Sequence, residues 1–290
     1  MSIVSEWERR GHLVSVGGDD VFVVDTEGDG DGPPALVLHG FPTASADWRL
    51  VVDALAGEHR LVLFDFPGFG LSSKPDRPYS LFEQADLTEE VARRLGLEQV
   101  ALVTHDMGDS VGGELLARSL DGDLGFEVAA RVLTNGSIYL DMANLTDGQQ
   151  LLLSLPDELA PEELRPGTNG LAAALRATLA PGSDVGDDEL AAHASLIERA
   201  DGDRLLPRTI RYIGERREHE DRWTGAIERH RSPLTVVWGD LDPIAVYPMA
   251  EKLVEARPDA TLVRLEGVGH YPMLEAPDAF AGAVRGALEA

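Results

Sequence analysis

A series of short β-rich apolar runs, most of them followed by turn residues and then by a segment with helical spacing, limits the fold of this chain more than any other feature. Such alternation predicts an α/β fold with a mostly parallel sheet and helices on both faces, because parallel strands need long crossover connections that are usually helical. Two alternating runs near the start flank a Gly-Gly turn and predict an antiparallel hairpin. The expected strands are 12–16, 21–25, 35–39, 61–65, 100–104, 131–134, 234–238 and 261–265.

The pattern of strands stops between about residues 136 and 231, where leucine, alanine and glutamate are frequent. Helical spacing over 171–179 and 189–200 predicts helices in this segment, which has no convincing strand. We therefore expect a helical cap that is inserted into the sheet domain. The predicted division is 1–136 for the first part of the core, 137–231 for the cap and 232–290 for the second part of the core.

Composition excludes several classes of function. The chain of 290 residues has no cysteine, which rules out disulfides, thiolate catalysis and cysteine-ligated zinc. The formal net charge of −26 makes nucleic acid and anionic membrane surfaces poor partners, and a small neutral organic substrate fits better. No apolar run is long enough to span a membrane, and the first ten residues do not resemble a secretory signal, so we expect a cytoplasmic protein. Composition does not predict the oligomeric state.

The densest chemical signal lies in residues 103–109, where an apolar run meets a helix-like segment. A sharp strand-to-helix turn raises one side chain above the edge of the sheet, and the helix N-terminus stabilises negative charge there. Asp106 occupies the raised position. An aspartate at this place also has a purely structural use, because aspartate is a common N-cap of helices.

Ser110 is a rival for the same role, because residues 108–112 match the G-x-S-x-G string of serine hydrolases. If Ser110 occupied the turn, the preceding strand would have to continue through residues 105–107. Two polar side chains would then lie in a buried parallel strand, which is costly without partners. With Asp106 in the turn, residues 100–104 form a clean strand, and this interpretation is favoured.

Further residues that follow predicted strands complete a candidate site. Phe41 comes shortly after the first parallel strand, where its backbone N–H can join that of Met107 as an oxyanion hole. His270 lies in a glycine-flanked loop after the last strand, and a histidine base needs a carboxylate on its other ring nitrogen. Asp242 is the favoured carboxylate and Asp240 is held in reserve, since both follow the strand 234–238.

These motifs resemble the α/β-hydrolases of the epoxide hydrolase and haloalkane dehalogenase group. The resemblance covers nearly the whole chain apart from the cap, and the motifs occur in the chain order of that group. The branch that this sequence looks most like is that of the mesoderm-specific transcript. The matching strings are His39-Gly40-Phe41-Pro42, Asp65-Phe66-Pro67-Gly68-Phe69-Gly70 with Ser72, His105-Asp106-Met107-Gly108, Gly239-Asp240-Leu241-Asp242 and Gly269-His270.

The resemblance implies a two-step hydrolysis in which the carboxylate of Asp106 attacks carbon and forms an ester. His270, oriented by Asp242, then activates a water that hydrolyses the ester, while the Phe41 and Met107 amides stabilise the oxyanion. Haloalkane dehalogenases commonly have Trp where this chain has Met107, and many have Asn at the place of Phe41. Haloacetate dehalogenases have arginines shortly after the nucleophile, where this chain has Met107 and Ser110. Both departures weigh against a dehalogenase.

Epoxide hydrolases use cap tyrosines to donate a proton to the ring oxygen, and Tyr212 resembles the site of one such tyrosine. Its helical setting is equally consistent with a packing role. We therefore expect an epoxide hydrolase that needs no cofactor and no metal. The alternatives that stay open are a haloalkane dehalogenase-like enzyme, a serine esterase that uses Ser110 and a non-catalytic small-molecule receptor.

Overall fold

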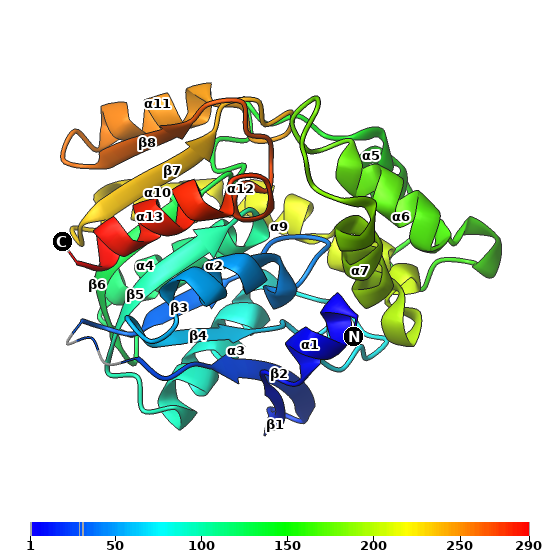
Figure 1. Cartoon of the computed structure of the whole chain (residues 1–290), viewed down its shortest axis with the longest axis horizontal. Coiled ribbons are helices and arrows are strands. Elements are labelled where there is room, and N and C mark those ends of the chain that lie inside the picture. The colour runs from blue at the N-terminus through cyan, green and yellow to red at the C-terminus, as the bar shows by residue number, and fades with distance from the viewer. Residues whose placement is uncertain (1, 29, 31, 290) are drawn as a thin grey trace.

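The computed structural model describes residues 2–28, 30 and 32–289, and within them eight strands form one sheet in the order β1-β2-β4-β3-β5-β6-β7-β8 (Figure 1). The first two strands form an antiparallel hairpin, β2 also pairs antiparallel with β4, and the remaining neighbours are parallel. The strands are β1 (His12–Val16), β2 (Asp19–Asp25), β3 (Ala35–Leu38), β4 (Leu61–Phe64), β5 (Gln99–His105), β6 (Glu127–Thr134), β7 (Leu234–Gly239) and β8 (Thr261–Leu265). The predicted α/β fold with its mostly parallel sheet is confirmed.

The central strands are apolar along their whole length because helices cover both faces of the sheet. Every residue of β3 and β4 is buried, which explains why these runs have no polar alternation. The structure extends β5 through His105, one residue beyond the predicted strand, and starts β6 at Glu127, four residues before the predicted one. These shifts leave the carboxyl ends of the strands, and therefore the site, close to where the sequence predicts them.

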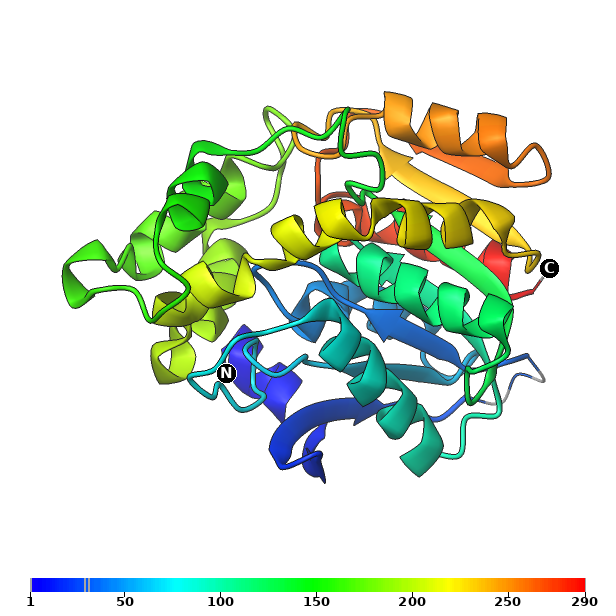
Figure 2. The same cartoon turned by 180° about the vertical axis from the view of Figure 1, so that it is seen from behind.

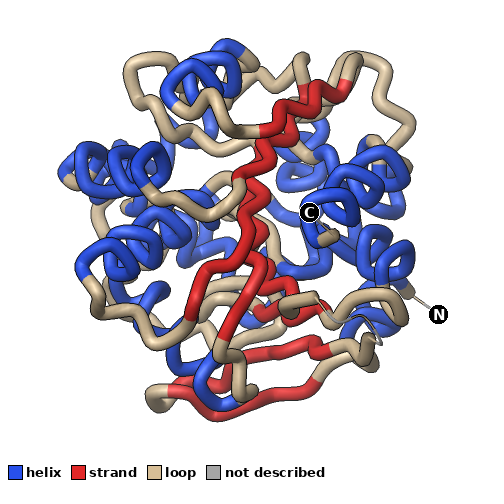
Figure 3. The backbone as a smooth tube through the Cα atoms, turned by 90° about the vertical axis from the view of Figure 1, so that its left-hand side faces the viewer, coloured by secondary structure: helices blue, strands red, loops and turns tan. Residues whose placement is uncertain are grey.

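Two groups of helices enclose the sheet on opposite faces, and the view along the sheet separates them clearly (Figure 3). In Figure 1 the helices α2 and α13 lie in front of the sheet, and in Figure 2 the helices α3, α4, α10 and α11 lie in front. The core is therefore a three-layer sandwich. The bounds are α2 (Arg49–Leu55), α3 (Leu81–Arg94), α4 (Met107–Asp121), α10 (Glu220–Arg229), α11 (Pro248–Ala256), α12 (Pro272–Glu275) and α13 (Pro277–Leu288).

The segment between β6 and β7, residues 135–233, is described throughout and contains helices but no strand. Its first helices project beyond the carboxyl ends of the strands (Figure 1), whereas α10 packs alongside α4 on a face of the sheet (Figure 2). The exact limits of the cap stay a prediction. The helices before α10 are α5 (Asp147–Ser154), η2 (Glu162–Leu164), α6 (Gly167–Arg176), α7 (Asp187–Glu198), η3 (Arg199–Leu205), α8 (Leu206–Thr209) and α9 (Tyr212–Glu218).

A short helix at the start, α1 (Ile3–Glu8), is absent from the sequence-based expectation. It packs against α7 and buries Trp7, whose indole N–H donates to the Ser45 hydroxyl at 3.2 Å. In the described part of the chain, no helix combines the length and the apolar character needed to cross a membrane.

Candidate active site

The sharp turn between β5 and α4 falls at Asp106. This residue has φ 50° and ψ −109°, a backbone conformation that non-glycine residues rarely adopt and that costs on the order of 1–3 kcal/mol. The helix begins at the next residue, so the positive end of its dipole faces the Asp106 position. Ser110 instead lies inside the first turns of α4, where it is buried and its hydroxyl accepts a hydrogen bond from Arg216 at 2.5 Å.

One carboxylate oxygen of Asp106, Oδ2, accepts the backbone N–H of Phe41 at 3.0 Å. The loop that supplies this N–H is held by His39, whose Nε2 accepts the Phe66 N–H at 3.1 Å and whose Nδ1–H therefore donates to the Gly40 carbonyl at 2.8 Å. Burial lowers the pKa of His39, which keeps this ring neutral. Gly40 is required here, because a Cβ atom would lie 2.8 Å from the Asp106 Cβ. Met107, the other predicted amide donor, is the first residue of α4.

The structure brings His270 and Asp242 together, as the sequence predicts. Nδ1 of His270 lies 2.8 Å from Oδ2 of Asp242, and both side chains are buried. The same carboxylate accepts the Asn135 amide at 2.7 Å and the backbone N–H groups of Ile244 and Ala245 at 2.7 and 3.0 Å. Four donors therefore fix the orientation of Asp242 and, through it, the tautomer of His270.

The reserve residue Asp240 points elsewhere. Its carboxylate accepts hydrogen bonds from Arg264 at 2.7 and 3.0 Å and from the Gly267 N–H at 2.8 Å. The carboxylate closest in sequence to the strand end is thus part of a surface ion pair, and the one two residues later faces the histidine.

Electrostatics at His270 favour its protonated form. Burial alone would lower its pKa, but the charge and hydrogen bond of Asp242, together with the charges of Asp106 and Glu275, raise the pKa of His270 to about 9. The backbone of His270 is held on both sides: its N–H donates to the Thr178 carbonyl at 3.0 Å, and its carbonyl accepts Nε2–H of His105 at 2.9 Å. Burial lowers the pKa of His105 to about 4, so this second histidine stays neutral.

Tyr212 begins α9 and lies beside the Asp106 turn. Its ring centroid is 5.5 Å from that of Phe41. Burial and the nearby charge of Asp106 raise the pKa of Tyr212, whereas the charge of Arg216 opposes that rise. Tyr139, at the entrance to the helical segment, is committed to another partner, because its hydroxyl donates to Glu228 at 2.8 Å.

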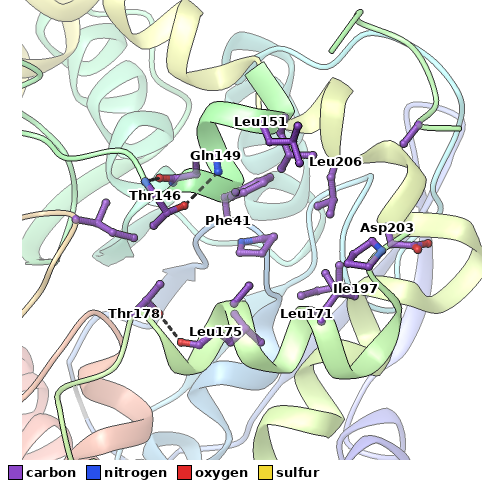
Figure 4. A pocket seen from close by; sticks show the side chains of 18 of the residues that line it. Phe41, Thr146, Gln149, Leu151, Leu171, Leu175, Thr178, Ile197, Asp203 and Leu206 are labelled. Carbon is purple, nitrogen blue, oxygen red and sulfur yellow. Dashed lines mark hydrogen bonds between the residues drawn. The ribbon is translucent and has the colours of Figure 1, made fainter. Parts of the chain in front are cut away.

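A cavity of about 200 Å³ opens between the loops at the strand ends and the helices beyond them (Figure 4). Phe41, His270 and Tyr271 line it on the side of the sheet domain, and leucine is the most frequent residue among the others. In Figure 4 Leu171 and Leu175 of α6 lie on one side and Leu151 of α5 lies on the other. Asp106 and Tyr212 are 3% and 4% exposed and do not line the cavity themselves; both contact Phe41, which lines it.

The polar groups on the cavity walls already have partners. Thr146 and Gln149 cap each other at the start of α5, and the Thr178 hydroxyl donates to the Leu175 carbonyl at 2.7 Å. The carboxylate of Asp203 accepts two hydrogen bonds from Arg165, at 2.8 and 3.0 Å. The walls thus offer no free charge to a ligand, which favours a neutral apolar molecule. Across the described ranges, no group of three or more histidine or acidic side chains is arranged to hold a metal ion.

Three residues of the site are not identified from the sequence. Asn135 directly follows β6 and joins Asp242 to the Gly239 N–H, which it accepts at 3.1 Å, so its place after a strand was a usable signal. Tyr271 follows His270 and lines the cavity. Arg216 is buried against the Asp106 turn, and nothing in the local sequence of its helix indicates this contact.

Comparison with known proteins places this architecture in a family. Residues 35–283 match the model of the alpha/beta hydrolase family. The chain belongs to the α/β-hydrolase family. It is a hydrolase-fold enzyme, and the resemblance seen in its motifs is confirmed.

Individual α/β-hydrolase relatives span nearly the whole chain. A putative hydrolase named LipZ from Mycobacterium tuberculosis is 41% identical over 282 residues, which is 97% of this chain and 96% of that protein. The mesoderm-specific transcript protein of Mus musculus is 33% identical and covers 97% of this chain and 86% of its own length. A crystal structure of a haloalkane dehalogenase, the DbeA-M1 loop variant from Bradyrhizobium elkanii, superposes with a TM-score of 0.74 at 21% identity and 96% coverage of both chains.

Proposed function

We propose that this α/β-hydrolase is an epoxide hydrolase that acts on a neutral, apolar substrate through an ester on Asp106. The observation that carries the proposal is the placement of Asp106 in the β5–α4 turn, with Oδ2 held by the Phe41 N–H and with the Tyr212 ring packed against that of Phe41. A carboxylate at this place suits attack on sp³ carbon. It suits attack on a carboxylic ester poorly, because the product would be an anhydride.

In the first step Oδ1 of Asp106 attacks a ring carbon of the epoxide. Among the described residues Oδ1 accepts no hydrogen bond, whereas Oδ2 is occupied by Phe41, so the two oxygens are already distinguished. The carbon–oxygen bond of the ring breaks, its electron pair goes to the ring oxygen, and that oxygen takes the phenolic proton of Tyr212. The result is a hydroxyalkyl ester on Asp106 and a phenolate on Tyr212.

In the second step His270 takes a proton from water, and the hydroxide attacks the ester carbon of Asp106. Negative charge develops on Oδ2, which already accepts a hydrogen bond from the Phe41 N–H. The Met107 N–H is the proposed second donor to this oxyanion. Collapse of the intermediate breaks the bond between the ester oxygen and the acyl carbon, and the departing diol oxygen takes the proton from His270. Asp106 is left as a carboxylic acid, which releases its proton while Tyr212 regains one, so that epoxide and water give a diol and the enzyme returns to its starting state.

The charge of Asp106 makes the pKa of His270 change between the two steps in the direction that the reaction needs. While Asp106 is ionised, its charge helps to raise the pKa of His270 to about 9. Ester formation removes that charge, so the pKa of His270 falls at the stage where the ring must accept a proton. Ester formation therefore favours the neutral form of His270, which is the form that can act as a base in the second step.

A halide-releasing reaction is less well supported by the residues present. Met107 offers no side-chain donor, and Phe41 contributes a ring and an amide where a halide would need N–H groups on both sides. A serine esterase is also disfavoured, because the Ser110 hydroxyl lies within α4 and is bonded to Arg216. A silent receptor would have no use for the four-donor support of Asp242.

A parallel activity screen of the purified protein tests the proposal. The substrates are styrene-type epoxides, bromoalkanes of similar size and nitrophenyl esters, whose products are a diol, bromide and nitrophenol. We expect diol formation to exceed the other two rates. Release of bromide at a comparable rate would favour the dehalogenase alternative, and nitrophenol release that is lost in Ser110→Ala would favour the esterase.

A further inference from the structure

Arg216 places a buried positive charge at the Asp106 turn. The residue lies on α9 and is 4% exposed, and its Cζ is 5.0 Å from the centroid of the Tyr212 ring. Arginine is rarely buried so completely unless it is paired, because an isolated charge loses its hydration. Among the described residues, no carboxylate forms an ion pair with this guanidinium.

The hydrogen bonds of Arg216 are made to neutral acceptors on two segments around the site. Nε donates to the Ser110 hydroxyl at 2.5 Å, Nη2 to the backbone carbonyl of Asp106 at 3.1 Å, and Nη1 to the backbone carbonyl of Ser137 at 3.2 Å. These bonds join α9 to the β5–α4 turn and to the loop after β6. They satisfy the N–H groups of the side chain, but none of them neutralises its charge.

The charge of Arg216 is instead coupled to the acidic groups of the site. It opposes the rise in the pKa of Tyr212 that burial and Asp106 cause, and it also opposes the rise in the pKa of Asp109, which burial dominates. Coulomb interactions between groups about 5 Å apart remain strong in a water-poor interior. The guanidinium therefore acts on Tyr212 and donates to the backbone carbonyl of Asp106, so it lies beside both residues between which negative charge moves in the proposed reaction.

We propose that Arg216 is a positioning residue that stabilises negative charge as it moves from Asp106 to the phenol of Tyr212 during opening of the substrate ring. This inference rests on the proposed function. Before the step the fixed cation is bonded to the backbone carbonyl of Asp106; after it the Asp106 carboxylate is a neutral ester, and the cation lies over the ring of the Tyr212 phenolate, with Cζ 5.0 Å from the ring centroid. Because the cation does not move, no reorganisation is needed when the charge shifts.

Arg216 could also serve only to hold α9 in place, and the experiment must distinguish this structural role from an effect of its charge. The neighbouring residue Glu215 provides a matched control, because it anchors the same helix from the other side. Its carboxylate accepts the Ser80 hydroxyl at 2.6 Å and the Leu81 N–H at 2.5 Å, at the start of α3, and in the described part of the chain it makes no hydrogen bond or ion pair to the Asp106 turn. Loss of Glu215 should loosen α9 without changing the charge beside Tyr212.

The experiment measures kcat/KM for diol formation over a series of small epoxides of similar size, from an alkyl epoxide through epichlorohydrin to a trifluoromethyl epoxide. Along this series the alkoxide that leaves becomes less basic and needs less help from a proton donor. The variants are Arg216→Gln, which removes the charge, Arg216→Lys, which keeps it, and Glu215→Gln. Thermal melting of each variant reports its stability.

We expect Arg216→Gln to slow the alkyl epoxide about a hundredfold and the trifluoromethyl epoxide less than about tenfold, because the lost stabilisation matters most for the most basic leaving oxygen. Arg216→Lys should recover much of the rate on the alkyl epoxide even if its melting temperature falls. Glu215→Gln should slow all the epoxides to the same extent. Equal losses over the series in Arg216→Gln, or the same pattern in Glu215→Gln, would overturn the inference. A wild-type protein that opens none of the epoxides would overturn the proposed function itself.

Discussion

Two regions, the candidate catalytic residues and the walls of the cavity, are held in place by different kinds of contact. The first region, called the floor, is Asp106, Asp242 and His270, of which only His270 lines the cavity while the two carboxylates are bonded to the lining residues Phe41 and His270. At the floor, Asp242 accepts four hydrogen bonds, His270 is held by side chain and backbone, and one oxygen of Asp106 is fixed by the Phe41 amide. The walls present leucine more often than any other residue, and their few polar groups are already hydrogen-bonded to other groups of the protein. Directional contacts define the floor, whereas shape alone defines the walls.

This difference predicts that the floor controls the chemical steps and that the walls control which substrate fits. A buried polar group that loses its partner costs the full desolvation of that group, so the floor tolerates little change in position or identity. An apolar wall contributes roughly 0.8 kcal/mol for each buried methylene, in proportion to area and without direction. We therefore expect substitutions in the floor to change the chemical steps and substitutions in the walls to change which substrate fits.

The largest expected effect comes from removing the proposed nucleophile. Asp106→Ala and Asp106→Asn should abolish turnover of any true substrate, because no other carboxylate lies in the β5–α4 turn. Ser110→Ala is the matched comparison four residues away, and it should keep most of the activity since its hydroxyl is a buried acceptor for Arg216. Steady-state rates on one epoxide decide the matter: an inactive Ser110→Ala together with an active Asp106→Ala would establish the serine alternative.

The second prediction separates the making of the covalent bond from its breaking. His270→Gln should react once and then stop as an ester on Asp106, because the first step needs only the carboxylate and a proton donor. Intact-mass measurement should show one added substrate mass, and peptide mapping should place it on the segment that contains Asp106. Normal turnover by this variant, or an unmodified protein after incubation with a substrate that the wild type consumes, would contradict the assigned role.

The pH dependence of the ester-breaking step sharpens the same assignment. Only neutral His270 can accept a proton, so breakdown of the ester should accelerate as pH rises and then level off. The ester form lacks the charge of Asp106 that helps to raise the pKa of His270 to about 9, so the rate should level off below that pH. Rapid-quench measurement of ester decay across the pH range checks this; a rate that still climbs above pH 9 would argue for direct attack by hydroxide.

Tyr212 packs against Phe41 and does not line the cavity itself, and its loss should have an intermediate effect. Tyr212→Phe should slow epoxide opening by about a hundredfold, on the order of 3 kcal/mol, because the hydrogen bond strengthens only as alkoxide charge develops. The melting temperature should change little. Tyr139→Phe serves as the control, since that hydroxyl is bonded to Glu228 and should leave the rate nearly unchanged. Unaltered epoxide kinetics in Tyr212→Phe would reduce this residue to packing.

The floor could be predicted from sequence and the walls could not, for a physical reason. Parallel strands bring residues such as Asp106, Asp242 and His270 to one edge of the sheet, so their place after a strand is enough to gather them. The expected length of the strand 100–104 also favoured Asp106 over Ser110 as the residue in the turn, and the structure has Asp106 between β5 and α4. The fold class followed from the same regular alternation of strands and helices.

The contacts of the helical segment depend on packing that local sequence does not encode. Arg216 reaches backbone carbonyls of residues far away in the chain, and a carbonyl has no sequence signature. The sequence likewise gave no sign that α10 would pack beside α4 rather than with the helices of the cavity. Helical periodicity identifies an apolar face, but it does not say which surface that face covers.

The smallest predicted effect tests whether the walls set substrate size without touching the chemistry. Leu175 lies on α6 and lines the cavity, and a phenylalanine there would occupy part of its roughly 200 Å³ (Figure 4). Leu175→Phe should raise KM for a bulky epoxide about tenfold, which is within the range for a one- or two-carbon misfit in an apolar pocket, and should leave kcat on a small epoxide unchanged. Leu120→Phe, at an exposed leucine of α4 far from the lining residues, is the control and should alter neither constant. Since the walls contact only the apolar part of the substrate, a loss of kcat on the small epoxide would mean that α6 also positions the floor, through the hydrogen bond between the His270 N–H and the Thr178 carbonyl.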